Sequence, residues 1–356
     1  MRKGWEYKRL DECANIEYGT RVVQKKDSGT LYPVYGGGGE TFRMDKFNRE
    51  DCLIVARFAM SRRCVRYVNG KFFLNDSGLS VKAGDKLYQS YLNYNIISLN
   101  DDIYHLGKGA AQRNLDVKSF KKLTIAIPPQ STQLAIVTEL DKINELIRLK
   151  KEQLKDFDNL AQSLFYEMFG DPVENEKGWE VKKLIEVSSL INGRAYKQNE
   201  LLSEGKYKVL RVGNFFTNSN FYYSNLELED EKYCYKGDLL FAWSASFGAF
   251  IWDEDKTIFH YHIWRVLFDK AILDIHYYQY LLNTMTSFFM NDVHGIGMVH
   301  LTKSGMEQYE LPLPPLSLQQ LFAQRIEQIE RENSEVQKSI QDLETLLASR
   351  MQYWFE

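Results

Sequence analysis

Four arginines lie close together in the first third of the chain. They are Arg57, Arg62, Arg63 and Arg66. An arginine guanidinium can donate two hydrogen bonds to the O6 and N7 atoms of guanine, or it can clamp a phosphate group. The group therefore predicts a contact with nucleic acid. The competing interpretation is a basic face that is exposed to solvent.

A second group of polar residues follows a small-residue segment that is typical of a loop. After Gly109 and two alanines come Gln112, Arg113 and Asn114. Gln and Asn side chains suit the edge of adenine, and an Arg side chain suits the edge of guanine. These three residues are candidates for reading bases, and the alternative is a capped turn with no ligand.

The second half of the chain offers more scattered candidates for nucleic-acid contact. The polar ones are Arg211, Asn214, Ser244, Ser246 and His262. Trp243 lies among them and suits a protein core equally well. Lys303, which follows His300-Leu-Thr, is a candidate for contact with a phosphate. The residue types alone assign none of these side chains to a particular base.

The sequence lacks the motifs of the enzymes that modify DNA. An adenine methyltransferase needs a polar residue before Pro-Pro-aromatic, but here Ile127 and Leu313 precede the two proline pairs and Gln130 and Leu316 follow them. No GxxxxGK[ST] phosphate loop occurs. Gly36–Gly39 is interpreted as a turn between strands rather than as a cofactor loop. We therefore expect no catalysis and no cofactor in this chain.

A metal site is not expected either. His260 and His262 have the spacing that places two side chains on one face of a strand, but no further ligands accompany them. Packing or contact with DNA is the favoured role for this pair. The four cysteines, Cys13, Cys52, Cys64 and Cys234, show no CxxC spacing. They are interpreted as reduced, buried thiols of a cytoplasmic protein.

Length and charge set the frame in which these residues must be positioned. The 356 residues predict two or three domains, with no apolar run long enough for a membrane span and no signal peptide. Residues 1–129 carry 22 Lys and Arg against 14 Asp and Glu, a net charge of +8. Residues 171–315 carry 14 against 20, a net charge of −6. Only the first region has the overall charge expected of a protein that approaches phosphates.

An internal repeat organises the chain. Lys3-Gly-Trp-Glu6 recurs as Lys177-Gly-Trp-Glu180, and the segment Ile127–Gln133 recurs as Leu313–Gln319. Between these anchors, short runs rich in Val, Ile, Tyr and Phe predict strands, for example over 51–58 and 238–243. The clearest helical segment is 277–289. The pattern predicts two similar mixed α/β domains.

A long helix is expected after each proline pair, because Pro suits the start of a helix and not its interior. Ser131 and Ser317 are the predicted N-caps, and Gly170 with Pro172 should end the first helix. Apolar residues or Ala occupy 17 of 20 positions of a heptad seam. In the first helix the seam is Ile136, Leu140, Ile143, Ile147, Lys150, Leu154, Phe157, Ala161, Leu164 and Met168, and in the second it is Phe322, Ile326, Ile329, Asn333, Val336, Ile340, Leu343, Leu347, Arg350 and Trp354.

The three interruptions of the seam are Lys150, Asn333 and Arg350. A polar residue at a core position of a coiled coil commonly fixes register, and this role is predicted for Asn333. Lys150 and Arg350 can instead extend their charged ends to solvent. Two equivalent units in one chain favour antiparallel helices. The seam from 136 to 168 would then span about 48 Å, compared with about 34 Å for one turn of DNA.

With its repeat, proline pairs and heptads, the chain resembles the specificity subunit of type I restriction–modification systems over essentially its whole length. The segments that carry the resemblance are Tyr32–Gly39, Gly109–Leu115, Leu210–Asn214, Gly237–Ser246 and His260–Ile263. The resemblance implies target recognition domains at 1–129 and 171–315, each reading one half of a split DNA sequence. It also implies spacer helices at 130–170 and 316–356.

The same resemblance implies partners that carry the chemistry. Two modification subunits would dock on the helices, bind S-adenosylmethionine and methylate adenine at N6, and restriction subunits that use ATP and Mg²⁺ could join them. Two rival functions remain. One is a coiled-coil interaction scaffold, with two unrelated domains, that reads no DNA. The other is a self-sufficient DNA-modifying enzyme, against which the missing motifs argue.

Overall fold

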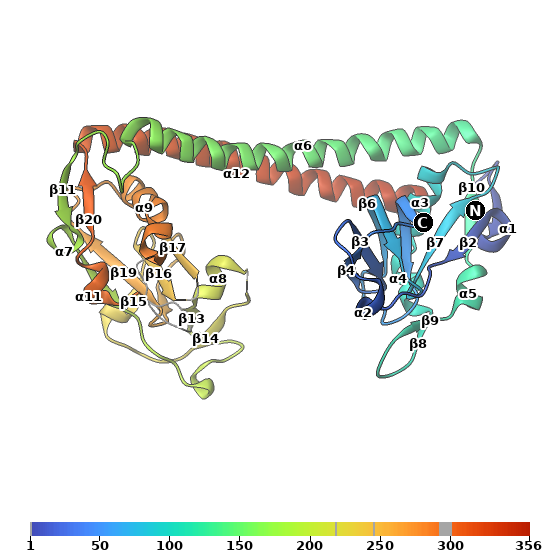
Figure 1. Ribbon diagram of the computed structural model, residues 1–356, viewed down its shortest axis with the longest axis horizontal. Helices are drawn as coiled ribbons and strands as arrows, with labels where there is room; N and C mark the ends of the chain where they lie inside the picture. The colour runs from blue at the N-terminus through green and yellow to red at the C-terminus, as the bar shows by residue number, and fades with distance from the viewer. Residues whose placement is uncertain (1, 218, 245, 292–300) are drawn as a thin grey trace. The chain divides into compact units, whose positions relative to one another are not determined.

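A computed structural model describes residues 2–217, 219–244, 246–291 and 301–356 of the chain. The chain divides into two units, one comprising Met1–Lys151 with Lys338–Glu356 and the other Glu152–Gln337 (Figure 1). Two 40-residue helices, α6 (Gln130–Phe169) and α12 (Leu316–Phe355), each contribute one half to unit 1 and one half to unit 2. No described helix is long and apolar enough to cross a membrane.

Unit 1 is built around a six-stranded sheet with the order β2-β7-β5-β6-β3-β4. Its strands are β2 (Ala14–Tyr18), β3 (Tyr32–Gly36), β4 (Gly39–Met44), β5 (Arg49–Ala56), β6 (Val65–Leu74) and β7 (Gly78–Ala83). The expected turn at Gly36–Gly39 is confirmed, because Gly36 pairs with Gly39 across the β3–β4 hairpin. β6 is ten residues long, so it pairs with β5 along most of its length and with β3 at its end.

Short helices and strand pairs complete unit 1. The helices are α1 (Leu10–Cys13), α2 (Gln24–Asp27), α3 (Gln89–Ser98), α4 (Asn100–His105) and α5 (Val117–Lys121). β8 (Gly107–Lys108) pairs with β9 (Asn114–Leu115). β1 (Glu6–Arg9) pairs with β10 (Thr124–Ile127), which leads directly into the proline pair and α6. The core combines apolar side chains from the sheet, α3 and the first half of α6, including Leu53, Tyr91 and Ile136.

Unit 2 repeats this order of elements, with the sheet divided in two. One sheet has the order β12-β19-β16-β17 and the other β14-β13-β18-β15. The strands are β12 (Ser188–Asn192), β13 (Tyr207–Leu210), β14 (Tyr222–Ser224), β15 (Tyr233–Cys234), β16 (Leu239–Ser244), β17 (Ser246–Ile251), β18 (Thr257–Phe259) and β19 (Ile263–Phe268). β11 (Glu180–Lys183) pairs with β20 (Glu310–Leu313), as β1 pairs with β10.

The helices of unit 2 are also short, apart from α6 and α12. They are α7 (Leu184–Val187), α8 (Val212–Phe216), α9 (Ile275–Thr284), α10 (Thr286–Asn291) and α11 (Lys303–Met306), with 3-10 turns η1 (Gln198–Glu200) and η2 (Asp230–Lys232). The helix expected over 277–289 is therefore two helices separated at Met285. The strands expected over 51–58 and 238–243 are confirmed as β5 and β16.

The two units share strand pairing as well as element order. β3 pairs in parallel with β6 in unit 1, and β13 pairs in parallel with β18 in unit 2. β5 lies between β6 and β7, and β16 lies between β17 and β19. The repeated Gly4 and Gly178 both adopt positive φ angles, 83° and 68°, which explains why the repeat keeps glycine there. The expectation of two similar mixed α/β domains is confirmed.

The long helices pack antiparallel within each unit. In unit 1, Glu139 of α6 contacts Arg350 of α12. Lys151 lies twelve residues further along α6 and contacts Glu344, six residues earlier in α12, at 2.7 Å. The two helices therefore run in opposite directions. In unit 2, Phe165 and Phe169 of α6 meet Phe322 of α12, with ring centroids 5.8 and 5.3 Å apart. Asp158 of α6 and Glu330 of α12 line one hollow further along the same helices, so the pairing predicted from the internal repeat is antiparallel in unit 2 as well. All twenty seam positions are buried or half-buried.

Details at the helix ends and in the seam differ from expectation. α6 begins at Gln130 and α12 at Leu316, so Ser131 and Ser317 lie inside the first turn and are not N-caps. Gly170, with a φ of 76°, follows the last residue of α6 as predicted. Asn333 accepts a 2.7 Å hydrogen bond from Gln337 of its own helix, and no cross-helix bond of Asn333 is seen in the described part of the chain.

Arg350, unlike Asn333, makes hydrogen bonds across the helix pair. Its guanidinium makes two hydrogen bonds to the carboxylate of Glu139, the second at 3.2 Å, and the Trp354 indole donates to the same carboxylate at 3.0 Å. Arg350 therefore does not simply extend to solvent. The pair fixes one register between the helix halves of unit 1, because a shift of either helix would break both bonds.

Candidate nucleic-acid interface

Backbone hydrogen bonds hold four loops together at one end of the unit 1 sheet. The Gly19 amide donates to the Gly78 carbonyl at 3.1 Å, and the Arg57 amide donates to the Ser77 carbonyl at 2.8 Å. The Asn75 amide donates to the Tyr35 carbonyl at 2.9 Å. These bonds connect the ends of β2, β3, β5 and β6, so that the side chains of the four loops are presented side by side.

The same bonds recur in unit 2 at the same end of the sheet. The Gly193 amide donates to Ile263 at 3.4 Å, the Trp243 amide to His262 at 3.1 Å, and the His260 amide to Leu210 at 2.9 Å. A β-carbon at Gly19 or Gly193 would lie only 1.9 or 2.3 Å from a backbone oxygen of the next loop. Glycine is therefore required at both positions for the loops to approach.

These recurring bonds identify equivalent positions in the loop clusters of the two units. Arg57 corresponds to Trp243, Asn75 to His260 and Ser77 to His262. Gly36, which follows Tyr35 at the end of β3, corresponds to Arg211, which follows Leu210 at the end of β13. The backbone frame is thus repeated while the side chains differ. This arrangement suits two domains that bind the same kind of ligand and read different sequences from it.

Aromatic rings hold the arginines of unit 1. The Arg57 guanidinium lies over the rings of Tyr18 and Phe58, 5.1 and 4.5 Å from their centroids. Arg62 and Arg113 both lie over Tyr104, at 5.6 and 4.6 Å. Stacking against rings limits the motion of the guanidiniums. Arg57 also donates to the Asp76 carbonyl at 3.2 Å and Arg113 to the Tyr104 carbonyl at 3.1 Å, and their other N–H groups can donate to a ligand.

The two polar groups found in the first domain's sequence come together in the structure. The Met60 amide donates to the Arg113 carbonyl at 2.9 Å, and the Leu115 amide donates to the Arg57 carbonyl at 2.8 Å. The Asn114 side-chain oxygen accepts from the Ala59 amide at 3.3 Å. The segments 57–66 and 112–114 therefore form one surface. Gln112 is exposed on it, whereas the Asn114 side chain is partly engaged in holding the two segments together.

Arg63 and Arg66 line a hollow of about 580 Å³ beside the β3–β4 hairpin. Arg66 donates to the carbonyls of Gly37 and Arg63 at 3.1 and 2.9 Å. Within the described ranges, no carboxylate lies within 4.0 Å of Arg57, Arg62, Arg63, Arg66 or Arg113. The positive charge of this surface is therefore not neutralised by an ion pair with a nearby carboxylate.

The candidates of the second half are brought together less completely. Asn214 uses both ends of its amide locally, accepting from the Arg211 amide at 2.8 Å and donating to the Ser219 carbonyl at 2.7 Å. Ser244 is only 1% exposed, so its hydroxyl is not offered to a ligand at the surface. Ser246 begins β17 and is half-buried. Lys303 lies 3.7 Å from Glu307, and His300 lies outside the described residues.

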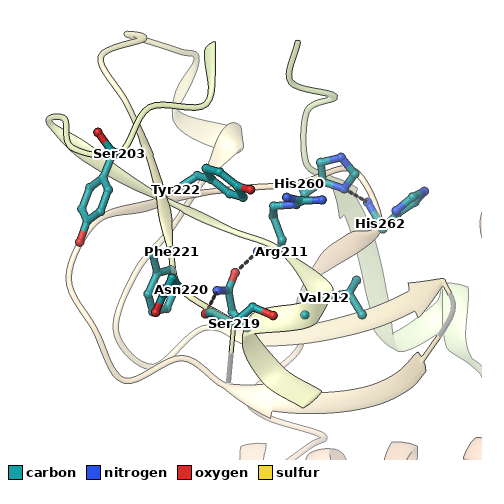
Figure 2. Close-up of a pocket in the computed structure, with 12 residues that line it drawn as sticks. Ser203, Arg211, Val212, Ser219, Asn220, Phe221, Tyr222, His260 and His262 are labelled. Carbon is teal, nitrogen blue, oxygen red and sulfur yellow. Dashed lines mark hydrogen bonds between the residues drawn. The ribbon is translucent and has the colours of Figure 1, made fainter. Parts of the chain in front are cut away.

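Arg211, His260 and His262 do meet, around a hollow of about 1050 Å³ (Figure 2). Its other lining residues are Ser203, Val212, Gly213, Asn214, Ser219, Asn220, Phe221, Tyr222 and Tyr223. Tyr222 was not among the candidates chosen from the sequence. In the structure the Arg211 guanidinium lies 5.3 Å from the centre of its ring. The same holds for Tyr18 and Tyr104 in unit 1, because pairing of an arginine with a ring depends on tertiary structure.

The two histidines do not lie on a strand as expected. His260 begins the turn between β18 and β19 and His262 lies within it, with ring centroids 4.8 Å apart. Burial, helped by His262 and Arg211, lowers the pKa of His260 to about 4. A second hollow, of about 540 Å³, lies between Trp243, His262 and Lys303. In the part of the chain that the structure describes, no three His, Cys, Asp or Glu residues gather as a metal site.

Both units thus present basic and aromatic side chains on matched loops, an arrangement typical of proteins with two nucleic-acid-binding domains. Residues 2–156 and 176–345 each match the family described as type I restriction modification DNA specificity domain. The chain belongs to this family, and it carries the domain twice.

Relatives and solved structures agree with the family. A putative type I restriction enzyme specificity subunit of Haemophilus influenzae is 24% identical over 345 residues, covering 91% of this chain and 87% of the relative. The MjaVIII specificity subunit of Methanocaldococcus jannaschii is 22% identical over 323 residues, covering 78% and 75%. The crystal structure of the S subunit from M. genitalium shares the fold with a TM-score of 0.58, at 16% identity over 98% and 95% of the two chains.

Proposed function

We propose that each unit reads one half of a split DNA target through the loop cluster at the end of its sheet. The observation that carries this proposal is the repeated backbone frame, in which Gly19 and Gly193 allow the same close approach of loops. The frame presents different side chains in the two units, for example Arg57 and Trp243. A specificity subunit with two such domains fits a bipartite target.

The residues proposed to contact DNA follow from their exposure and pairing. In unit 1 they are Arg57, Arg62, Arg63, Arg66, Gln112, Arg113 and Asn114. In unit 2, Arg211 and His262 line the hollow, and Lys303 lies beside the second hollow. Structural roles are proposed for Asn214 and Ser244, because the Asn214 amide is hydrogen-bonded within a turn and Ser244 is buried. The recognition domains are inferred to span 1–129 and 171–315.

The long helices are proposed to dock two modification subunits, one on each unit. Leucines remain exposed beside the seam: Leu134 and Leu346 in unit 1, and Leu160 and Leu321 in unit 2. Leu160 and Leu346 are separated by the 186-residue repeat and occupy equivalent positions, whereas Leu134 and Leu321 have no leucine at their equivalent positions. A groove of about 720 Å³ next to Leu134 and Leu346 adds to the unit 1 patch. Exposed apolar patches of this kind are typical of protein interfaces.

We infer that the chain selects the target and leaves bond chemistry to its partners. S-adenosylmethionine, ATP and Mg²⁺ would be bound by the modification and restriction subunits, and adenine methylation would take place in the cytoplasm. The sequence lacks the methyltransferase and phosphate-loop motifs, which supports this division of work.

A DNA-shift assay tests the proposal against the scaffold alternative. The full chain, assembled with its modification subunits, should bind one split sequence more tightly than shuffled DNA. We use the complex because the chain alone has a net charge of −3 and should bind DNA weakly. Equal affinity for all sequences, with and without the chain, would favour the scaffold that reads no DNA. Methylation or cleavage by the purified chain alone would favour the self-sufficient enzyme.

A further inference from the structure

The hollow of unit 2 has an unusual composition for an acidic domain. Residues 171–315 carry 20 Asp and Glu against 14 Lys and Arg. None of the twelve residues that line the hollow is acidic, and three of them are Arg211, His260 and His262. A nucleic-acid-binding domain of net negative charge needs local positive points where phosphates approach. The hollow is such a point.

Arg211 differs from the other arginines of this domain. Arg194 is held by Glu200 in two hydrogen bonds of 3.0 and 2.8 Å, and Arg265 lies 3.6 Å from Asp238. Within the described residues, no carboxylate lies within 4.0 Å of the exposed Arg211 guanidinium. Its backbone amide is fixed by Asn214 and its charge rests over Tyr222, so the side chain is positioned without being neutralised.

His260 adds a second hydrogen-bond donor. Its Nδ1 accepts a long hydrogen bond of 3.4 Å from the His262 amide. Because burial lowers the pKa of His260 to about 4, its ring is neutral at pH 7 and the remaining proton is on Nε2. Arg211 and the Nε2–H of His260 both donate and neither accepts. Figure 2 shows the two side chains next to each other at the hollow.

We propose that this hollow binds a phosphate group of the DNA backbone, with Arg211 as its main partner and His260 as a neutral donor. The inference rests on the proposed function and deepens it. A hollow receives a convex ligand, and the sugar–phosphate ridge is the convex part of a duplex, whereas base edges lie on the floor of a groove. The contact positions unit 2 on DNA and carries no sequence information itself.

In the part of unit 1 that the structure describes, no arginine stands at the position equivalent to Arg211. The position of Arg211 is occupied there by Gly36, where an added β-carbon would lie 2.9 Å from the Asn75 side chain. The chain between β3 and β4 is a two-residue turn, whereas residues 211–221 separate β13 from β14 in unit 2. The longer segment contributes most of the lining. The two units therefore obtain their phosphate contacts from different elements on the same frame.

The test uses the full chain assembled with its modification subunits and the methylation target of the wild type. Three variants are compared: Arg211→Gln, Arg211→Lys and the control Lys270→Gln. Lys270 is exposed just beyond the opposite end of β19, so its loss removes one charge away from the hollow. Affinity is measured against salt, and single phosphates of the unit 2 half-site are replaced by neutral methylphosphonate.

The wild type should lose affinity when one or two neighbouring phosphates are neutralised, and Arg211→Gln should be insensitive there. Arg211→Gln should also have a salt slope smaller by about one, so between 50 and 200 mM salt it loses about threefold less affinity than the wild type. Arg211→Lys and Lys270→Gln should retain the wild-type pattern. The preferred sequence should be the same for all variants, which shows that they are folded.

Two results would overturn the phosphate site and leave the proposed function intact. In one, Arg211→Gln and the wild type respond alike to neutralisation of every phosphate. In the other, Arg211→Gln and Arg211→Lys both relax the preference for a single guanine, which would make Arg211 a base-reading residue. If the wild-type complex shows no sequence preference at all, the proposed function fails, and the phosphate site falls with it.

Discussion

Gln133 and Gln319 hold the two long helices to their domains through the same hydrogen bonds. The Gln133 amide donates to the carbonyls of Pro128 and Lys86 at 2.9 and 2.8 Å, and its oxygen accepts from the Tyr88 amide at 2.9 Å. Gln319 bonds to Pro314, Ile272 and Asp274 at 2.8, 3.0 and 2.8 Å. Both side chains are fully buried. They fix the direction in which each helix leaves its proline pair.

Replacing Gln133 should therefore loosen the joint between domain and helix in unit 1. Gln133→Leu removes the partner of the buried Pro128 carbonyl and of the part-buried Lys86 carbonyl and Tyr88 amide, at a cost of about 1–3 kcal/mol. Thermal or denaturant unfolding measures this loss, and Ser131→Ala, at an exposed position two residues earlier in α6, is the control. Loss of stability equal to that of the control would show that the joint does not depend on the glutamine. Methylation by the complex should also tolerate altered spacing between half-sites.

The Glu139–Arg350 pair predicts a dependence of stability on pH. Hydrogen bonds from Arg350 hold the pKa of Glu139 below its ordinary value of 4.5. The stabilisation is present above about pH 4.5 and is lost as the pH falls through the lower folded pKa. Arg350→Met should lower the stability only slightly at pH 7, because the pair is partly exposed. The difference between the variant and the wild type should shrink towards pH 3. A constant difference would contradict the assignment.

Asn333→Leu should raise the stability of the helix pair without altering the spacing between half-sites. The Asn333 side chain bonds to its own helix, so its loss breaks no cross-helix hydrogen bond, and an apolar side chain packs better in the seam. Melting of the complex and the spacing of methylated half-sites are the measurements. A changed spacing would restore the register role first predicted for this residue.

Tyr104 should be needed for recognition by unit 1. Tyr104→Leu removes the ring under Arg62 and Arg113, so both guanidiniums gain freedom that must be lost again on binding. Affinity for the full target should fall several-fold, with the loss confined to contacts of the unit 1 half-site. Tyr32→Leu is the matched control, since Tyr32 lies at the opposite end of β3 from the loop cluster. Equal effects of the two changes would argue against the role of the Tyr104 ring.

His260 should make unit 2 less stable in mild acid. Its folded pKa of about 4 lies below the ordinary 6.5, so the neutral ring is favoured by folding. That stability is complete above about pH 6.5 and is lost as the pH falls towards 4. The melting temperature of the wild type should fall between pH 6.5 and 5, where few carboxylates titrate, and the fall should be smaller for His260→Gln. His105→Gln, which changes an exposed histidine of unit 1, should leave the fall as it is.

The elements with local signals could be predicted from sequence, and the contacts between distant segments could not. Pro128-Pro129, the heptad positions and Gly170 indicated α6 almost to the residue. The repeat of Gln133 at Gln319 was visible, but its meaning required the loops near Lys86 and Ile272. Arg350 was interpreted as a surface charge because Glu139 lies 211 residues away in sequence.

The candidate site shows the same division. Arginine types and basic charge located the segment 57–66, whereas its aromatic supports, Tyr18 and Tyr104, come from other parts of the chain. Asn214 and Ser244 were chosen for their chemistry, but hydrogen bonding and burial decide what a polar side chain can offer a ligand. The backbone hydrogen bonds that recur in the two loop clusters could not be predicted from the sequence either, because bonds between backbone groups of loops leave no pattern in residue types.

Mapping of methylated adenine across the host genome tests the central claim most directly. Cells with the gene should show a split motif that disappears when the gene is deleted. Combined Arg62→Gln and Arg113→Gln changes should relax only one half of the motif, and the change His262→Ala, at the residue that lines both hollows of unit 2, only the other. A motif that survives deletion, or one in which both halves change together for either variant, would contradict two domains that read separate half-sites.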